Sequence, residues 1–180
     1  MGSSIITGRG DSGETDLLFG KRIAKSSQRV AVLGCVDELN AALGLARAAS
    51  HDGEIIRLID GLQSQLVGLM GELACVPEDV RRYAERFKGA LVMADVLHIE
   101  ETAKGYEARG IHFTGWARPG AEGSMMKAGL DFARTIARRT EREAWILHES
   151  GEPVGEAILL YFNRLSDLLW ILARAGGGEA

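Results

Sequence analysis

The stretch that decides the fold runs over residues 124–175 and reads SMMKAGLDFARTIARRTEREAWILHESGEPVGEAILLYFNRLSDLLWILARA. Its second half repeats apolar residues at the spacing of one helix face, namely Val154, Ile158, Tyr161, Leu165, Leu168 and Leu172. Between the two halves, Gly151 and Pro153 interrupt the pattern, as glycine and proline do at helix ends. We therefore expect two long helices, over residues 124–148 and 154–175.

The rest of the chain carries three more helical patterns. Working toward the N-terminus, we expect helices over residues 77–107, 53–76 and 27–49, and a loop over residues 110–123, which holds Pro119 and several glycines. Five helices joined by mostly short connections predict an all-α, up-and-down five-helix bundle over residues 27–175. A glycine-rich segment with few strand-forming residues precedes it over residues 1–26, and residues 176–180 form a flexible tail.

The composition excludes several classes of protein. Hydrophobic residues make up 46% and charged residues 26% of the 180 residues, which is typical of globular chains. A formal charge of -4 argues against a nucleic-acid partner, because such partners bind basic surfaces. No apolar run approaches the roughly 20 residues that cross a bilayer, and the polar N-terminus is unlike a signal peptide. We expect a cytoplasmic protein without a nucleic-acid or membrane partner.

The cysteines and histidines give no metal or disulfide signature. Cys35 and Cys75 are too few for a disulfide framework and lack the spacing of a zinc site, so we expect small buried side chains in helices. The four histidines share no ligand spacing, which argues against a helical di-metal site. The residues that would hold a metal therefore remain unknown at this point.

The N-terminal segment contains a glycine motif. Gly8, Gly10 and Gly13 spell G-x-G-x-x-G, but no strand precedes them and no parallel-sheet pattern follows, which argues against a dinucleotide-binding fold. Glycine leaves backbone N–H groups accessible, and together with nearby hydroxyl groups these suit phosphate oxygens, while Asp11 could support a metal. The alternative is a terminus that stays disordered unless a ligand or partner orders it.

Residues 134–142 place several arginines on one helix face. Arg134, Arg138 and Arg142 are four residues apart, and Glu141 lies on the same side. Stacked like charges repel one another unless an anion faces them. Carboxylates of neighbouring helices and a polyphosphate are both candidates for this anion. A solvated helix face is the remaining alternative.

Four blocks of the sequence, taken in order, resemble the PduO-type ATP:cob(I)alamin adenosyltransferases. They are TGRGDSGET over residues 7–15, KSSQR over 25–29 continuing into GCVDELNAALG over 34–44, ARTIARRTER over 133–142, and YFNRLSDLL over 161–169. Weaker similarity at residues 62–63 and 71–74 extends the resemblance to most of the chain. A short glycine motif is weak evidence by itself, whereas four blocks in order are specific.

The resemblance implies a fold and an activity. The fold would be a ferritin-like, cobalamin adenosyltransferase-like bundle that assembles as a homotrimer with active sites between subunits. The activity would be transfer of the 5'-deoxyadenosyl group of ATP to the cobalt of a reduced corrinoid, which forms adenosylcobalamin and releases triphosphate. ATP, Mg²⁺, the corrinoid and a reductase partner would take part. A binding protein of the same fold that delivers or senses the cofactor is the alternative, and a purely structural bundle is a second one.

The resemblance also implies site residues. The ATP site would use one set from the N-terminal segment: Thr7, Gly8, Arg9, Gly10, Asp11, Gly13, Thr15, Asp16 and Lys25. A second set would come from the neighbouring subunit: Arg138, Arg139, Thr140, Glu141, Arg142 and Asn163. Asp37 and Arg134 would pair across the subunit interface, and we count them with Arg138 and Glu141 as catalytic. An ion pair between Arg134 and the nearby Asp131 is the local alternative.

The sequence departs from the family at several places, of which two lie in predicted binding segments. Gly8 stands where the family usually has Lys or Arg, and Trp116-Ala117-Arg118-Pro119-Gly120-Ala121 stands for the family's F-x-x-P-G-G corrinoid loop. Cobalt(I) is itself a strong nucleophile, so the protein must position it and stabilise the leaving triphosphate. Trp116, Phe113 or Phe132 could form the apolar wall that excludes the lower axial ligand of cobalt.

Overall fold

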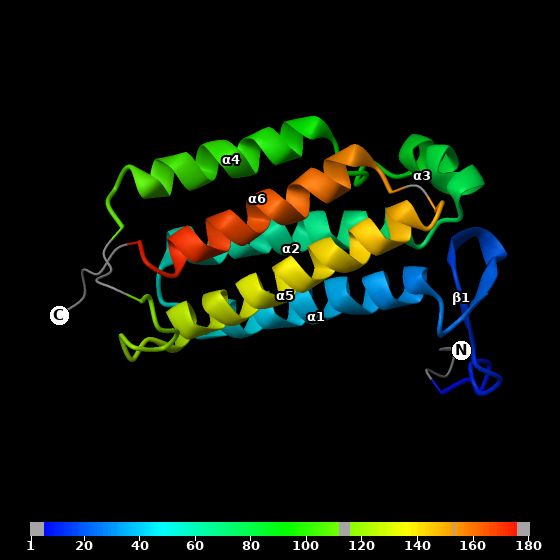
Figure 1. Ribbon diagram of the computed structural model, residues 1–180, viewed down its shortest axis with the longest axis horizontal. Coiled ribbons are helices and arrows are strands. Elements are labelled where there is room, and N and C mark those ends of the chain that lie inside the picture. The colour runs from blue at the N-terminus through cyan, green and yellow to red at the C-terminus, as the bar shows by residue number, and fades with distance from the viewer. Residues whose placement is uncertain (1–5, 112–115, 153, 176–180) are drawn as a thin grey trace.

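The computed structural model describes residues 6–111, 116–152 and 154–175 (Figure 1). In these residues the chain forms six α-helices: α1 Gln28–Ala48, α2 Gly53–Leu73, α3 Val80–Arg86, α4 Met93–Glu107, α5 Met125–Glu149 and α6 Glu156–Leu172. Two short strands, β1 Glu14–Asp16 and β2 Arg22–Ala24, precede them. Two single-turn 3-10 helices are Leu18–Gly20 and Pro77–Asp79.

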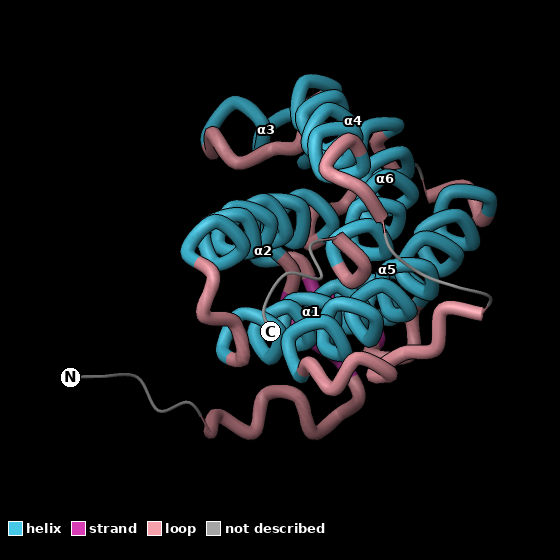
Figure 2. The backbone as a smooth tube through the Cα atoms, turned by 90° about the vertical axis from the view of Figure 1, so that its left-hand side faces the viewer, coloured by secondary structure: helices cyan, strands magenta, loops and turns pink. Residues whose placement is uncertain are grey.

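The five long helices form one up-and-down bundle, as predicted. Each long helix runs antiparallel to the next long helix in the chain, and α1 and α5 pack together along most of their lengths (Figure 1). Seen along the bundle, α6 lies between α4 and α5, and α2 lies beside α1 (Figure 2). The core between them is apolar, and its largest fully buried side chains include Leu39, Leu66, Leu130, Tyr161 and Phe162.

Polar caps fix the starts of three long helices. The side chains of Ser27, Asp52 and Ser124 accept hydrogen bonds from backbone N–H groups in the first turns of α1, α2 and α5. Such caps satisfy N–H groups that have no partner inside the helix, and each contributes about 1 kcal/mol. The predicted boundaries of α1 and α5 therefore agree with the structure to within one or two residues.

The predicted single helix over residues 77–107 is wrong. The chain instead forms the 3-10 turn, α3, an irregular crossing over residues 87–92, and α4. This crossing brings the main chain of Gly89 against Gly68 of α2, where a Cβ atom on Gly68 would collide with the Gly89 carbonyl oxygen. The Tyr83 hydroxyl also donates a hydrogen bond to the Gly68 carbonyl at 2.9 Å. Close packing on α2 therefore breaks the helix.

The N-terminal segment contains a hairpin that the sequence analysis does not predict. Strands β1 and β2 pair antiparallel, with Thr15 opposite Ile23. The hairpin docks on the end of α2 because Leu17 is buried and the Leu18 N–H donates to the Ala74 carbonyl at 2.9 Å. Contacts within the same chain therefore hold residues 14–24 in place. No parallel sheet occurs among the described residues, in agreement with the argument against a dinucleotide-binding fold.

The two cysteines are free thiols in different settings. Cys75 is buried as expected, but it follows the end of α2 instead of lying in a helix, whereas Cys35 lies in α1 and is only half-buried. Burial raises the pKa of both thiols above the ordinary value. Among the described helices, none combines the length and the apolar character that a membrane crossing needs.

Candidate functional site

The glycine-rich segment turns tightly over residues 7–13. The Arg9 N–H donates to the Thr7 hydroxyl oxygen at 3.4 Å, and the Asp11 N–H donates to the Gly8 carbonyl at 3.1 Å. Gly8 and Gly13 have φ angles of 66° and 83°, in the left-handed region that glycine adopts without strain. The segment therefore exposes main-chain polar groups in a compact turn.

Lys25 closes this turn from the end of β2. Its N–H donates to the Gly13 carbonyl at 2.8 Å. Its amino group lies beside Gly10. A Cβ atom at this position would lie only 2.8 Å from Lys25 Nζ, so the glycine leaves room for the amino group. No carboxylate among the described residues forms an ion pair with Lys25. The ammonium group is therefore available to an external anion beside exposed main chain.

The other cations of the segment already have partners. Arg9 pairs with Asp16 at 3.2 Å, and Arg22 pairs with Glu14 at 3.3 Å and with Asp16 at 3.0 Å. All of these side chains are substantially exposed. The nine N-terminal residues that the sequence singles out, Thr7 to Lys25, thus lie together in one turn and hairpin. Within the described ranges, Lys25 forms no ion pair with a carboxylate.

Arg138 and Arg142 form an exposed cationic pair on α5. Arg142 donates to the Arg138 carbonyl at 3.0 Å, and no carboxylate in the described ranges lies within 4 Å of either guanidinium group. The neighbouring Glu141 does not neutralise them, because it accepts a hydrogen bond at 3.0 Å from the Asn163 amide of α6. Within the described part of the chain, the anion that faces Arg138 and Arg142 is therefore not a carboxylate of a neighbouring helix.

Two other residues of the same block turn away from this face. Arg139 forms an ion pair with Glu38 of α1. Thr140 is fully buried, and its hydroxyl donates to the Ile136 carbonyl at 2.9 Å. Both side chains thus have partners within the same chain, and their contact with ATP stays a prediction.

Arg134 has the local partner that the sequence offered as the alternative. Its Nε donates to Asp131 Oδ1 at 2.9 Å. Asp37 is exposed on α1, and no described residue forms a hydrogen bond or ion pair with it. Within one chain Asp37 and Arg134 do not meet, and their contact across a subunit interface stays a prediction.

The loop over residues 116–123 lies at the opposite end of the bundle from the hairpin (Figure 1). Helix α5 begins beside this loop and ends near the hairpin, and its 25 residues span about 37 Å at roughly 1.5 Å per residue. One chain therefore holds Trp116 far from Lys25.

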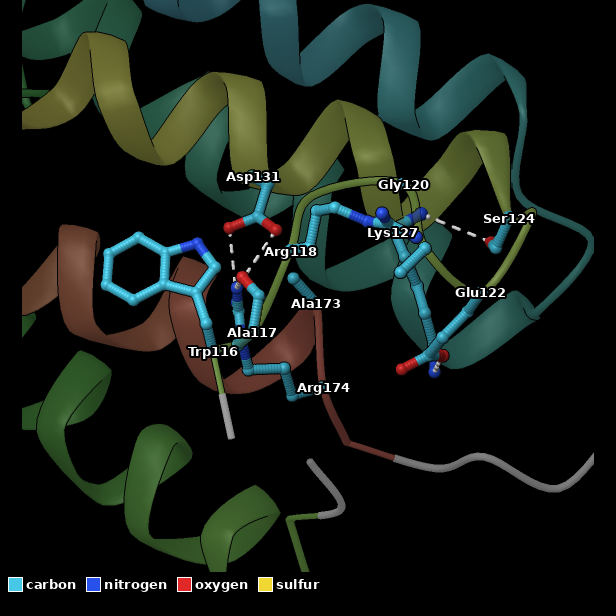
Figure 3. Close-up of a pocket in the computed structure, with 11 residues that line it drawn as sticks. Trp116, Ala117, Arg118, Gly120, Glu122, Ser124, Lys127, Asp131, Ala173 and Arg174 are labelled. Atoms are coloured by element: carbon cyan, nitrogen blue, oxygen red, sulfur yellow. Dashed lines mark hydrogen bonds and ion pairs between the residues drawn. The ribbon is translucent and has the colours of Figure 1, made fainter. Parts of the chain in front are cut away.

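A cavity of about 380 Å³ opens under this loop (Figure 3). Its lining includes Trp116, Arg118, Lys127, Asp131 and Arg174. The Trp116 side chain is 88% exposed, so its apolar ring is available for contact with a ligand in this cavity. Of the two other aromatic residues considered for the apolar wall, Phe132 is about half exposed on α5, and Phe113 lies outside the described residues.

Arg174 belongs to the lining of this cavity, and the sequence pattern does not single it out. This residue lies just beyond α6, is only 6% exposed, and forms an ion pair with the equally buried Asp131 at 3.0 Å. Arginine is common at the C-terminal ends of helices, so its spacing gives no hint that it is buried. In the described part of the chain, no group of three or more His, Cys, Asp or Glu side chains could hold a metal ion.

Comparison with known proteins shows the family of the chain. A sequence model of the cobalamin adenosyltransferase family matches residues 5–176. The corrinoid adenosyltransferase of Mycobacterium leprae is 34% identical over 172 residues, which cover 94% of this chain and 89% of the relative. The corrinoid adenosyltransferase PduO of Salmonella typhimurium is 34% identical over 180 residues, which cover 98% of this chain. This chain spans about half the length of the Salmonella protein, 51%.

A solved structure extends the likeness to three dimensions. A variant PduO-type ATP:corrinoid adenosyltransferase from Lactobacillus reuteri, complexed with cobalamin and ATP, has a TM-score of 0.80 at 28% sequence identity. The match covers 95% of this chain and 92% of that one. From the family match over residues 5–176 and these relatives, the chain belongs to the cobalamin adenosyltransferase family.

Proposed function

We propose that this chain transfers the 5'-deoxyadenosyl group of ATP to the cobalt of a reduced corrinoid, with triphosphate as the leaving group. The observation that carries the proposal is the set of three cations, Lys25, Arg138 and Arg142, that lack a carboxylate partner among the described residues. All three lie in blocks that resemble the family. The relatives named as corrinoid adenosyltransferases, and the related structure complexed with cobalamin and ATP, support the same reaction.

The reaction explains why the site offers cations and no activated nucleophile. Cobalt(I) supplies the electron pair that attacks C5' of ATP, so no side chain needs to act as a base. The protein must hold the two reactants in line and stabilise the negative charge that grows on the triphosphate. Lys25 beside the glycine turn, together with Arg138 and Arg142, provides this stabilisation. Glu141 and Asn163 hold each other in a fixed arrangement next to the arginines.

Mg²⁺ fits this site as an ion held mainly by the phosphates. It usually keeps several waters and takes only one or two carboxylates from a protein. Asp11 supplies one such carboxylate next to the glycine turn, and no described cation forms an ion pair with it. Bound there, Mg²⁺ would neutralise phosphate charge, while Lys25 and the arginines orient the phosphate chain.

The position of the cavity supports an active site shared between copies of the chain. A corrinoid under the Trp116 loop and a nucleotide at the hairpin of the same chain would lie at opposite ends of the bundle. Their reacting atoms must approach within about 3–3.5 Å, so a second copy has to supply one of the two sites. The unpaired Asp37 and the exposed apolar side chains of Phe132, Trp145 and Ile146 are suited to such an interface.

We propose a homotrimer, as the family resemblance implies, in which Asp37 of one subunit reaches Arg134 of the next. Asp131 pairs with two guanidinium groups, those of Arg134 and Arg174, but carries only one negative charge. A second carboxylate would balance the remaining positive charge. A separate reductase would supply the reduced corrinoid, and the free thiols accord with a cytoplasmic site of action.

An anaerobic assay tests the proposal. Chemically reduced cobalamin and Mg-ATP are mixed with the protein, and the visible spectrum of the product with its cobalt–carbon bond is followed together with the release of triphosphate. Formation of both products in equal amounts is expected. Binding of ATP and corrinoid without triphosphate release would instead indicate the delivery or sensor function that the sequence leaves as the alternative.

A further inference from the structure

Arg174 and Asp131 form a buried clamp under the Trp116 loop (Figure 3). The guanidinium group donates from Nη1 to Asp131 Oδ1 at 3.1 Å and from Nη2 to Asp131 Oδ2 at 3.0 Å. Arg174 also donates to the Trp170 carbonyl at 3.0 Å, and its guanidinium carbon lies 4.5 Å from the centre of the Trp170 ring. These contacts fix the plane of the guanidinium group between α5 and α6.

The same guanidinium group reaches the loop. Arg174 Nη2 donates to the carbonyl oxygen of Ala117 at 3.3 Å, one residue from the exposed Trp116. The next residue of the chain, Ala175, pairs with Ile111 in an isolated β-bridge. The end of α6 therefore contacts the segment between α4 and α5 at two points, on either side of residues 112–115.

The described loop has few other attachments. Its remaining backbone hydrogen bonds are internal turns, from Ala121 to Arg118 and from Gly123 to Gly120. Lys127 forms an ion pair with Glu122 near the start of α5. Within the described residues 116–121, the main chain is thus joined to the helices through the hydrogen bond that Arg174 donates to the Ala117 carbonyl.

We propose that Arg174 is a positioning residue for the corrinoid: it fixes the main chain at Ala117 and so holds Trp116 at the mouth of the cavity. The inference rests on the proposed function. A buried ion pair gives little net stability, and apolar residues of similar volume often replace one without loss. A guanidinium group is suited to the additional task because its planar fork binds a carboxylate with two nitrogens and still leaves donors for a carbonyl.

The experiment changes Arg174 and leaves Asp131 in place, because Asp131 also serves Arg134. Arg174→Lys keeps the positive charge facing Asp131, but one ammonium group cannot reproduce the fork together with the bond to Ala117. Arg174→Met removes both. Arg109→Lys is the matched control, since Arg109 pairs with Glu54 at the exposed end of α4 and does not line the cavity.

Two measurements are made on each variant. The first is the pair of KM values for reduced cobalamin and for ATP. We expect Arg174→Lys to raise the cobalamin KM at least about tenfold while the ATP KM stays within about twofold, because a displaced Trp116 removes binding contacts to the corrinoid and leaves the nucleotide contacts at the other end of the chain in place. The second is amide hydrogen exchange of residues 116–123 without any ligand, which should be faster in both Arg174 variants and unchanged in Arg109→Lys.

The outcomes separate the clamp from the proposed function. Unchanged exchange in residues 116–123, or equal changes in the two KM values, would overturn the positioning role. If hydrogen exchange is faster in the Arg174 variants but the wild-type protein makes no cobalt–carbon product, the clamp is supported and the proposed reaction is refuted. If Arg174→Met does not fold, Arg174→Lys alone decides between these results.

Discussion

The two loops at the ends of the bundle are held in place in opposite ways. The N-terminal hairpin is docked on α2 by the buried Leu17 and by the Leu18 N–H. Its ion pairs, Arg9 with Asp16 and Arg22 with Glu14 and Asp16, are all exposed. The loop over residues 116–123 relies on Arg174 and Asp131, which are both buried. Exposed pairs of this kind contribute about 0–1 kcal/mol, whereas breaking one partner of a buried pair costs about 3–5 kcal/mol.

This difference matches the ligands proposed for the two ends. A triphosphate brings its own charge, so a hairpin with weak internal contacts can adjust to it and become more ordered when it binds. A corrinoid is large and rigid, and an exposed Trp116 must already be in place to receive it. Preorganisation lowers the entropic cost of such binding.

The largest effect is expected from removing the carboxylate of the clamp. Asp131→Ala leaves the buried Arg174 without its counterion, so the free energy of unfolding should fall by about 3–5 kcal/mol. Urea unfolding followed by circular dichroism measures it, with Asp167→Ala on the exposed side of α6 as the control. A loss below about 1 kcal/mol would mean that the clamp is no stronger than the ion pairs of the hairpin.

A smaller effect is expected at the cationic face of α5. Arg138→Ala removes a charge-assisted contact to triphosphate, which is worth about 1.5–3 kcal/mol, so kcat/KM should fall at least about tenfold. The folded protein should keep its stability because Arg138 is exposed and forms no ion pair with the described residues. Arg138→Lys, which retains charge without the fork, should give an intermediate value. Kinetics equal to the wild type would remove Arg138 from the ATP site.

The two loops should also respond differently to nucleotide. At Mg-ATP concentrations about ten times its dissociation constant, hydrogen exchange over residues 7–25 should slow about tenfold, which corresponds to about 1.4 kcal/mol. Residues 116–123 of the same subunit should change less, because the clamp already holds them. Equal protection with and without nucleotide would place the ATP site elsewhere.

The smallest effect concerns stability of the hairpin. Arg22→Ala should lower the free energy of unfolding by less than about 1 kcal/mol, and 1 M salt should abolish the difference because it screens exposed charges. Thermal unfolding of the ligand-free protein at low and high salt provides the measurement. A loss that persists at high salt would show that Arg22 contributes packing and not charge.

Much of the fold can be predicted from the sequence because its causes are local. Apolar residues repeat at helical spacing, and Ser27 and Ser124 cap the helices that follow them. The break in the predicted helix over residues 77–107 cannot be predicted in this way. It arises where Gly89 packs on Gly68, a contact between residues far apart in the chain that leaves no local pattern.

For the site residues, the sequence predicts the exposure of some side chains and not the burial of others. The row of Arg134, Arg138 and Arg142 follows from spacing alone, and the structure leaves the last two exposed. The family resemblance implies a site role for Thr140. Yet it lies two residues, or about 200°, around the helix from Arg138, and its burial is consistent with that geometry. The burial of Arg174 cannot be predicted from local spacing, because the residues that contact it belong to α5 and to the Trp116 loop.

We propose that the N-terminal segment of one subunit and α5 of another build one ATP site. Producing Lys25→Ala and Arg138→Ala chains separately and together in one cell tests this arrangement. Each variant alone lacks one half of every site. In mixed assemblies, about a quarter of the sites should combine both intact halves if neighbours share them, so adenosyl transfer should recover to about that fraction of the wild type. A mixture no more active than its two parents would contradict a shared site.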